Sequence, residues 1–200
     1  MRIGVIVLAA GASSRMGSPK QLLRYRGQTL IRRAAEAAIA SSCNRVAVVI
    51  GSNASQMRRE LEDLPVSVVE NQNWHTGMSS SIRAGLDELR PHDLDGVVIM
   101  LCDQPFVTAG ILNDLIATHR QTGKPIVASC YETTKGVPAF FSRDLFTDLT
   151  SLSADEGARR LIVKHPELVA TINFPEGAID IDTPQDTKKL SHKKTQKAQK

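Results

Sequence analysis

Short apolar runs alternate with amphipathic helical patterns along most of this 200-residue chain. The runs expected to form strands lie at residues 3–10, 46–51, 67–70, 96–101 and 125–131. Several of them are continuously apolar, which is typical of parallel strands buried on both faces, and most are followed by a segment with the period of a helix. The pattern therefore predicts an α/β fold with helices on both faces of a mostly parallel sheet.

Helices are expected at residues 29–42, 55–64, 79–89 and 157–165, and in a segment that Thr108 caps and Gly123 closes. Shorter extended segments are expected at 139–141, 169–174 and 178–181, with a few helical turns at 142–149. Thr183 begins a cap, proline and acid sequence that is typical of a final helix. Without a repeat or a long linker, we expect one domain over residues 1–190 and a tail over 191–200.

The formal charge of +4 belongs to the tail. Residues 191–200 hold four lysines and no acid, so the rest of the chain has 21 basic residues against 21 acidic ones. A segment without apolar side chains except one alanine is expected to be disordered, although a weak contact with an anionic partner stays open. The neutral body and an aromatic content of only 4% disfavour a nucleic-acid-binding function.

The cysteines indicate a reducing compartment. Cys43, Cys102 and Cys130 are widely spaced and form no C-x-x-C pair, which argues against a disulfide framework and against a structural zinc site. No apolar run approaches the ~20 residues of a membrane helix, and Met1 leads directly into the first expected strand rather than into a signal peptide. We therefore expect a cytoplasmic protein that does not associate with a membrane.

A loop rich in small residues follows the first strand. It contains Gly11, Gly17 and three serines, with Arg15 and Lys20 as its positive charges. Backbone N–H groups of such a loop cradle phosphate oxygens, and charge-assisted bonds strengthen the contact. The spacing fits neither G-x-x-x-x-G-K-[ST] nor G-x-G-x-x-G, and the second strand ends without an acid, so a Walker loop and a dinucleotide fingerprint are both excluded.

Isolated acids at strand ends are the expected ligands of a magnesium ion, which takes one or two carboxylates and keeps several waters. Asp103 follows the apolar run 96–101 directly and is the strongest candidate. Asp180 and Asp182 lie two residues apart, so an extended chain would turn both to one side. Either of these two is equally consistent with an ordinary turn acid.

The segment 71–86 contains a second possible ligand site. Gly77 and the serines at 79–81 open an expected helix, whose first N–H groups suit an anion or a polar ring. The serines are equally consistent with simple helix caps. Trp74 and His75 fit either a pocket wall or the core.

The loop L-A-A-G-A-S-S-R-M-G-S-P-K at 8–20 resembles the signature of nucleotidyltransferases with the Rossmann-like, nucleotide-diphospho-sugar transferase fold. The resemblance extends over about residues 3–190. It is closest to the molybdenum cofactor cytidylyltransferases of the MobA-like NTP transferase superfamily. They share L-A-A-G, D-Q-P at 103–105, G-x-P-x-x-F at 136–141 and a late motif at 152–159.

The resemblance implies a set of site residues. Arg15 and Lys20 would contact the triphosphate and act in catalysis together with Asp103, while Asp103 and Asp182 would bind Mg²⁺. Gly77 and Ser81 match the family segment that holds the base and ribose. The full nucleotide site implied in this way consists of Leu8, Ala9, Ala10, Gly11, Arg15, Lys20, Gly77, Ser81 and Asp103.

The implied activity is transfer of CMP from CTP to the terminal phosphate of a molybdopterin cofactor, with release of pyrophosphate and with a molybdoenzyme as the receiving partner. Val137 and Ala154 depart from the family pattern on the acceptor side. Cys102 also occurs in the guanylyltransferase branch, so GTP and another phosphorylated acceptor remain alternatives. A non-catalytic cofactor carrier is an alternative of another class, and it would not need the charged loop.

Overall fold

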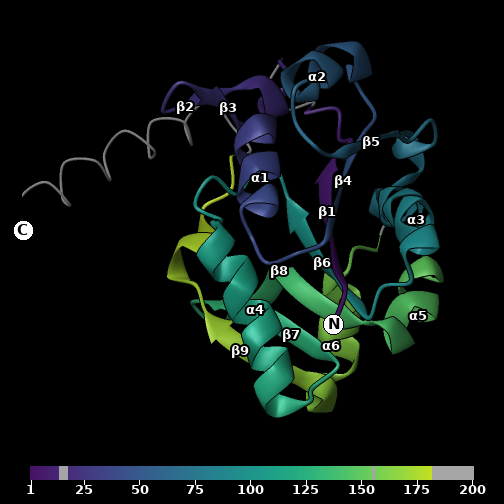
Figure 1. Ribbon diagram of the computed structural model, residues 1–200, viewed down its shortest axis with the longest axis vertical. Helices are drawn as coiled ribbons and strands as arrows, with labels where there is room; N and C mark the ends of the chain where they lie inside the picture. Colours follow the sequence, from purple (N-terminus) through teal and green to yellow (C-terminus); the bar gives the residue numbers. More distant parts are fainter. Residues whose placement is uncertain (14–17, 155, 182–200) are drawn as a thin grey trace, which may run out of the picture.

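The computed structural model describes residues 1–13, 18–154 and 156–181. Seven of its strands form one sheet (Figure 1). The strand order is β5-β4-β1-β6-β8-β7-β9. All pairings are parallel except those that β8 makes with β6 and β7. The strands are β1 (Ile3–Ala9), β4 (Arg45–Ile50), β5 (Ser67–Glu70), β6 (Gly96–Leu101), β7 (Ile126–Tyr131), β8 (Thr134–Ser142) and β9 (Val169–Asn173).

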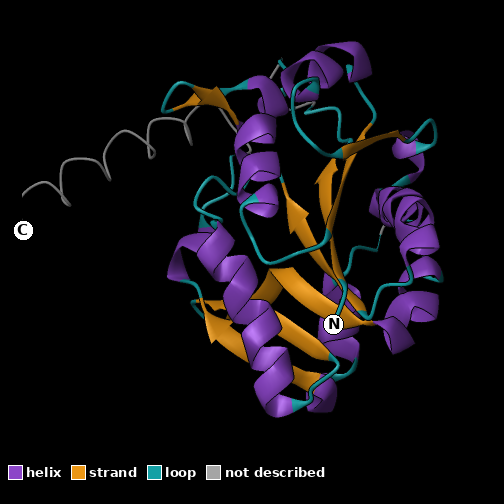
Figure 2. Ribbon diagram, viewed as in Figure 1, coloured by secondary structure: helices purple, strands orange, loops and turns teal. Residues whose placement is uncertain are grey.

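Helices cover both faces of this sheet (Figure 2). Three of them share a buried cluster on one face: α1 (Leu30–Ile39), α2 (Ala54–Leu61) and α4 (Ala109–Thr122). Another three share the cluster on the opposite face: α3 (Met78–Leu89), α5 (Phe146–Thr150) and α6 (Arg159–Lys164). The predicted three-layer α/β fold is therefore confirmed.

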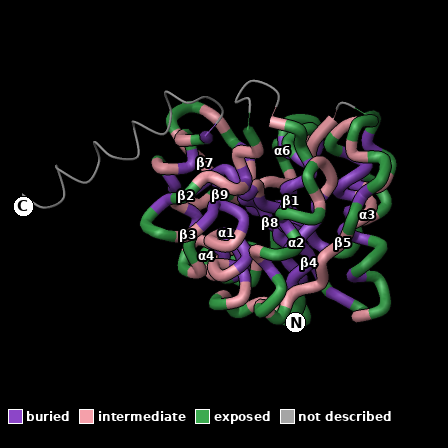
Figure 3. Tube along the Cα trace, turned by 90° about the horizontal axis from the view of Figure 1, so that it is seen from above, coloured by how far each residue is buried: buried purple, intermediate pink, exposed green. Residues whose placement is uncertain are grey.

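The central strand shows why the apolar runs are continuous. Val5 and Val7 of β1 belong to the cluster under α1, whereas Ile6 and Leu8 belong to the cluster under α3. Because side chains of a strand alternate between the two faces, a strand covered on both faces needs apolar residues at every position. Figure 3 shows the result as buried segments in the middle and exposed segments outside.

Threonine side chains cap two helices, α1 and α4, and the cap at Thr108 was predicted. The Thr29 hydroxyl oxygen accepts a hydrogen bond from the Arg32 backbone N–H, and Thr108 does the same for Ile111. Gly123 ends α4 in the left-handed conformation at a φ of 66°, which glycine adopts without the steric penalty of a Cβ.

Two expectations for the second half of the chain were wrong in part. Residues 178–181 do not form a strand. A short 3-10 helix occupies Pro175–Ala178, and the Ile181 N–H donates to the carbonyl of Asp103 rather than to a neighbouring strand. β8 is much longer than the expected 139–141, since it pairs with β7 along most of its length as well as with β6.

A small hairpin was not predicted. β2 (Arg24–Tyr25) and β3 (Gln28–Thr29) pair through a turn at Arg26 and Gly27, which have φ values of 54° and 85°. Two consecutive positive φ values are typical of the tight hairpin turn that suits strand twist. The predicted final helix at Thr183 and the tail 191–200 lie outside the described residues. Among the described residues, no helix has the length and apolar character needed to cross a membrane.

Candidate active site

The candidate site lies where the chain changes direction across the sheet. From β1 the chain first builds β4 and β5 on one side, and then crosses to β6 on the other side of β1. In open α/β sheets the loops diverge at such a switch point and ligands bind there, so we call the region at the carboxyl ends of β1 and β6 the crevice. The phosphate loop of residues 10–19 follows β1, and Asp103 follows β6. The fold thus brings together two motifs that are more than eighty residues apart in the sequence.

Lys20 and Asp103 form an ion pair at the centre of this crevice. The Lys20 Nζ lies 2.5 Å from Oδ2 of Asp103, and the two side chains are 18% and 10% exposed. The other carboxylate oxygen, Oδ1, is buried and has no hydrogen-bond partner among the described residues. A partly buried carboxylate with one oxygen uncommitted is a donor that suits a hard divalent cation.

The described residues contain no group of three or more His, Cys, Asp or Glu side chains that could hold a metal ion. A full protein cage is therefore missing from this part of the chain, and a cation bound at Asp103 would rely on one or two carboxylates and on substrate phosphates. The second predicted metal ligand, Asp182, and the predicted phosphate contact Arg15 lie outside the described residues.

Gln21 braces the phosphate loop, a role that the sequence reasoning missed. This side chain is 1% exposed, and its Nε2 donates to the backbone oxygens of Ala9 and Gly11 at 3.0 and 2.6 Å. Its Oε1 accepts from the Ser13 hydroxyl, whose oxygen in turn accepts from the Lys20 N–H. A polar residue directly after Lys20, at the start of an otherwise apolar stretch, was the available signal.

The residues at the end of β1 serve mainly the scaffold. The side chains of Leu8 and Ala9 pack into the two core clusters, and Ala10 is only 6% exposed. Their carbonyl oxygens accept from Cys102 N, Gln21 Nε2 and Ser52 N in turn. Only Gly11 is exposed among the four predicted positions, so nucleotide contact by this segment stays a prediction.

The predicted base and ribose segment begins α3. Gly77 has a φ of 115°, a conformation that side chains rarely adopt. Ser81 is buried, and its hydroxyl oxygen accepts from Nδ2 of Asn71 at 3.0 Å. Trp74 packs closely against Gly51. A Cβ added at Gly51 would lie 2.7 Å from the Trp74 side chain and 2.9 Å from the carbonyl oxygen of Ala10. Trp74 therefore lies beside the end of β1.

A second wall of the crevice lies on the far side of Asp103 from the loop, because β6 separates β1 from β8. We call residues 136–138 of β8 together with residues 175–181 the outer wall. The Gln104 Nε2 donates to the carbonyl oxygens of Val137 and Gly177 at 3.1 and 3.2 Å. The Ile181 N–H donates to the Asp103 carbonyl at 3.1 Å.

Tyr131 packs closely against this wall. Its hydroxyl would lie 2.1 Å from a Cβ at Gly136, so a side chain at that position would displace the Tyr131 ring. Burial and the nearby charge of Asp180 raise the pKa of Tyr131, partly offset by Arg159. Tyr131 therefore remains a neutral hydroxyl at physiological pH.

Cys102 is not a nucleophile in this arrangement. Burial, with a further contribution from the adjacent Asp103 charge, raises the pKa of the Cys102 thiol far above its usual range. The reactive form of cysteine is the thiolate, so a protonated, buried thiol takes no part in chemistry. Its N–H instead pairs with the carbonyl of Leu8 and joins β6 to the end of β1.

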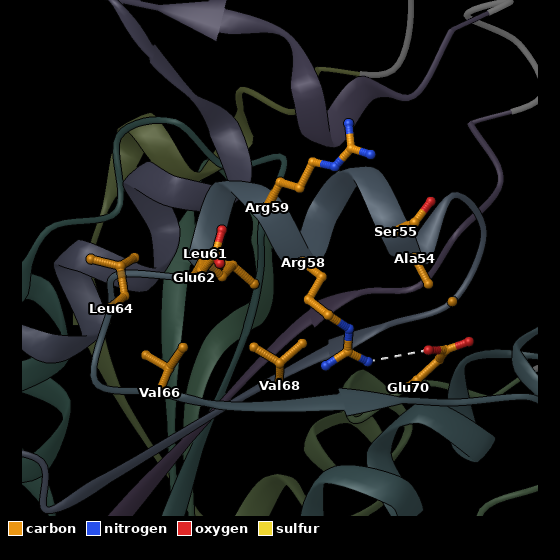
Figure 4. Close-up of a pocket in the computed structure, with 11 residues that line it drawn as sticks. Ala54, Ser55, Arg58, Arg59, Leu61, Glu62, Leu64, Val66, Val68 and Glu70 are labelled. Carbon is orange, nitrogen blue, oxygen red and sulfur yellow. Dashed lines mark hydrogen bonds and ion pairs between the residues drawn. The ribbon is translucent and has the colours of Figure 1, made fainter.

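A groove between α2 and the edge strand β5 lies apart from these residues (Figure 4). Arg58 reaches from α2 to Glu70 on β5, 3.2 Å away, over the apolar residues Val66 and Val68. As far as the described residues define it, none of the predicted site residues lines the groove. The two arginines and two glutamates that line it sum to zero charge, so it offers no net charge for a triphosphate.

Comparisons with known proteins agree with this geometry. The model of the MobA-like NTP transferase domain matches residues 5–169. Nicotine blue oxidoreductase of Paenarthrobacter nicotinovorans is 32% identical, over 92% of this chain and 94% of that protein. Purine catabolism protein PucB of Bacillus subtilis (strain 168) is 30% identical, over 92% and 93%.

Solved structures give the same result. Rv0371c from Mycobacterium tuberculosis H37Rv matches with a TM-score of 0.80 and 31% identity, covering 96% of this chain and 99% of that one. A structure of the same protein in complex with manganese matches with a TM-score of 0.79. The family match spans most of the chain, and the fold and the predicted signature agree with it. The chain belongs to the MobA-like NTP transferase family and is a nucleotidyltransferase.

Proposed function

We propose that the protein transfers CMP from CTP to the terminal phosphate of a molybdopterin-type cofactor and releases pyrophosphate. The observation that carries this proposal is the contact between Lys20 and Asp103, which joins the phosphate loop to a strand-end carboxylate in one crevice. The resemblance of four motifs to the molybdenum cofactor cytidylyltransferases supports the choice of acceptor. A solved relative complexed with manganese supports a divalent metal, for which we propose Mg²⁺.

The reaction places two anions in line. An oxygen of the acceptor phosphate attacks the α-phosphorus of CTP, and the bond from that phosphorus to the pyrophosphate oxygen breaks. The acceptor is already ionised at neutral pH, so no general base is required. Lys20 and Arg15 hold the triphosphate and offset the charge that develops on the leaving pyrophosphate.

The metal site uses the uncommitted oxygen of Asp103, with Asp182 as the proposed second ligand. A bound Mg²⁺ neutralises phosphate charge and acts as a Lewis acid. Lys20 exchanges the carboxylate for the triphosphate when the nucleotide enters, because both cannot hold its ammonium in the same position. Ala10, Gly11, Gly77 and Ser81 complete the proposed nucleotide site.

The test is pyrophosphate release for each of the four NTPs, with and without molybdopterin. We expect release with CTP that depends on molybdopterin and on Mg²⁺, and the appearance of molybdopterin cytosine dinucleotide by mass spectrometry. Preference for GTP would assign the protein to guanylyl transfer. Binding of the cofactor without pyrophosphate release from any NTP would favour the carrier function.

One relative bears the name of an oxidoreductase, which makes redox chemistry a second candidate. The loop after β1 lacks the G-x-G-x-x-G spacing, and β4 ends at Ile50 before Gly51, Ser52 and Asn53 without the acid that binds a dinucleotide ribose. These features favour nucleotidyl transfer. Oxidation of NADH or NADPH in the presence of an aromatic acceptor at rates comparable to pyrophosphate release would reverse that choice.

The proposal also covers organisation and location. We propose one catalytic domain over residues 1–190, with the basic segment 191–200 as a tail outside it. All three cysteines are free, which agrees with a reducing, cytoplasmic setting. A molybdoenzyme that takes up the finished dinucleotide is the proposed partner, and pull-down of such an enzyme from a cell extract, with and without the bound product, tests it.

A further inference from the structure

The side chain of Gln104 joins three segments that are distant in the sequence. It follows Asp103 directly and is 4% exposed. Its Nε2 donates both to Val137 in β8 and to Gly177 in the 3-10 helix Pro175–Ala178. A single amide therefore ties the turn after β6 to both parts of the outer wall.

This part of the outer wall lacks the support of the sheet. The pairing of β8 with β6 runs from Ser142 only as far as Ala139, and its pairing with β7 shifts register between Ala128 and Ser129. Residues 137 and 138 fall in the gap that both irregularities leave. A strand segment outside the regular ladder needs other donors for its carbonyl oxygens.

Two side chains supply those donors. The Ser129 hydroxyl donates to the Pro138 carbonyl at 2.7 Å, and Gln104 donates to the Val137 carbonyl at 3.1 Å. Both bonds are at least partly buried, where hydrogen bonds are least exposed to competition from water. Of these two bonds to residues 137 and 138, the one from Gln104 originates beside Asp103, so it relates the position of this segment to that of the carboxylate. The Ile181 N–H, which donates to the Asp103 carbonyl, ties the other end of the outer wall to the same turn.

We propose that Gln104 is a positioning residue for nucleotidyl transfer, which holds the outer wall at a set distance from Asp103 and thereby aligns the acceptor with the bound nucleotide. This inference rests on the proposed function in taking the outer wall as the acceptor side. Gln104 itself contacts neither substrate. It acts on the acceptor through Val137 and Gly177, and has no bond to the phosphate loop in the described part of the chain.

The test combines kinetics with hydrogen exchange on the full-length protein. Gln104→Met keeps the length of the side chain and removes both donated bonds, and Gln56→Met, exposed on α2, is the matched control. In Gln104→Met we expect amide exchange to rise about tenfold in peptides covering 134–141 and 175–181. We expect the KM for molybdopterin to rise about tenfold, while the Kd for CTP from calorimetry stays within about twofold of wild type.

The outcomes separate the inference from the proposed function. Unchanged amide exchange in both peptides overturns the inference. A loss of CTP affinity as large as the loss of acceptor affinity also overturns it, because a merely destabilised fold would weaken the binding of both substrates. If wild-type protein transfers no nucleotide to molybdopterin, the proposed acceptor is wrong, and the exchange measurement alone decides whether Gln104 holds the wall. Should Gln104→Met fail to fold, Gln104→Leu also removes both donated bonds, and the same exchange increase is required of it.

Discussion

The two sides of the Lys20–Asp103 contact are each braced by a buried glutamine, and the two glutamines differ in how completely they are bonded. Gln21, on the phosphate-loop side, donates to two carbonyls and accepts from Ser13. Gln104, on the side of the outer wall, donates to two carbonyls, but its buried Oε1 has no donor among the described residues. An unsatisfied buried acceptor costs about 1–3 kcal/mol.

This difference separates a saturated network from an incompletely satisfied one. On the phosphate-loop side, the described residues Ala9, Gly11 and Ser13 are held by these bonds in the absence of a ligand, which is the preorganisation expected of the proposed triphosphate site. In the outer wall, residues 137 and 138 lie outside the regular ladder, and the glutamine that holds them keeps one buried oxygen without a donor among the described residues. The nucleotide side is therefore expected to tolerate change poorly, and the outer wall to tolerate it better.

The largest effect is expected at the residue between the two sides. Asp103→Asn keeps the volume and removes the negative charge, so both the metal and Lys20 lose their partner. We expect kcat to fall by roughly 10²–10³-fold, or about 3–4 kcal/mol of transition-state stabilisation. Steady-state pyrophosphate release checks this, with Asp114→Asn, exposed on α4, as the control. Near-native turnover in a folded Asp103→Asn protein would remove Asp103 from the metal site.

The next effect sharpens the contrast between the glutamines. Gln21→Met removes three hydrogen bonds and leaves the carbonyls of Ala9 and Gly11 without this donor. We expect a loss of about 1–3 kcal/mol in the free energy of unfolding and about a tenfold weaker Kd for CTP. Urea denaturation and calorimetry measure the two quantities. If CTP affinity is unchanged while affinity for the acceptor falls, the acceptor binds on the Gln21 side, and the assignment of nucleotide and acceptor to the two sides is wrong.

Removing Lys20 should expose the metal ligand. In the nucleotide-free protein its ammonium lies 2.5 Å from Asp103 Oδ2, and its charge repels a cation that approaches the other oxygen of the same carboxylate. Lys20→Met should therefore bind Mn²⁺ about tenfold more tightly without nucleotide, equivalent to about 1.4 kcal/mol. Free Mn²⁺ measured by electron paramagnetic resonance gives the affinity. Arg24→Met removes one exposed positive charge elsewhere and controls for net charge. Equal Mn²⁺ affinities in wild type, Lys20→Met and Arg24→Met would show that Lys20 does not compete with the metal for Asp103.

The smallest effect concerns the base. The Ala10 carbonyl lies close to Gly51, which packs against Trp74, and we expect the Ala10 methyl group to narrow the space next to the bound base. We expect CTP to be preferred over GTP by roughly 10–200-fold in kcat/KM, the range that one methyl group supplies, and Ala10→Gly to narrow that preference. Initial rates with both nucleotides at saturating molybdopterin decide it. A wild-type preference for GTP would exclude the cytidylyl assignment and leave nucleotidyl transfer in place.

The parts of the fold that could be predicted are those with a local physical signature. Continuous apolar runs indicated β1, β4 and β6, and capping residues such as Thr108 and Gly123 gave the ends of α4. The length of β8 and the turn at 175–178 could not be predicted, because both depend on which strand lies alongside. Pairing partners are a property of the tertiary structure.

The same division applies to the site. Lys20 and Asp103 stood out because a charged residue after a buried strand has few structural uses, and the structure brings them together. Gln21 and Gln104 carry a weaker signal, a polar residue directly after a motif residue, because such a glutamine looks like any surface residue until its burial is known. Their importance lies in the backbone oxygens they reach, and no spacing rule identifies those.

The reversed direction of β8 has a consequence for how such a protein diversifies. Because β8 runs against its neighbours, the sheet edge near the crevice carries a hairpin tip, with Glu132 and Thr133 exposed between β7 and β8. Hairpin tips accept insertions without a change of register in the strands below them. A lineage that acquires a new acceptor is thus expected to vary in length at 132–133, while the loop after β1 keeps its length. Differences in length among homologous chains would then be concentrated in this one hairpin, and the loop after β1 would be inherited almost unchanged.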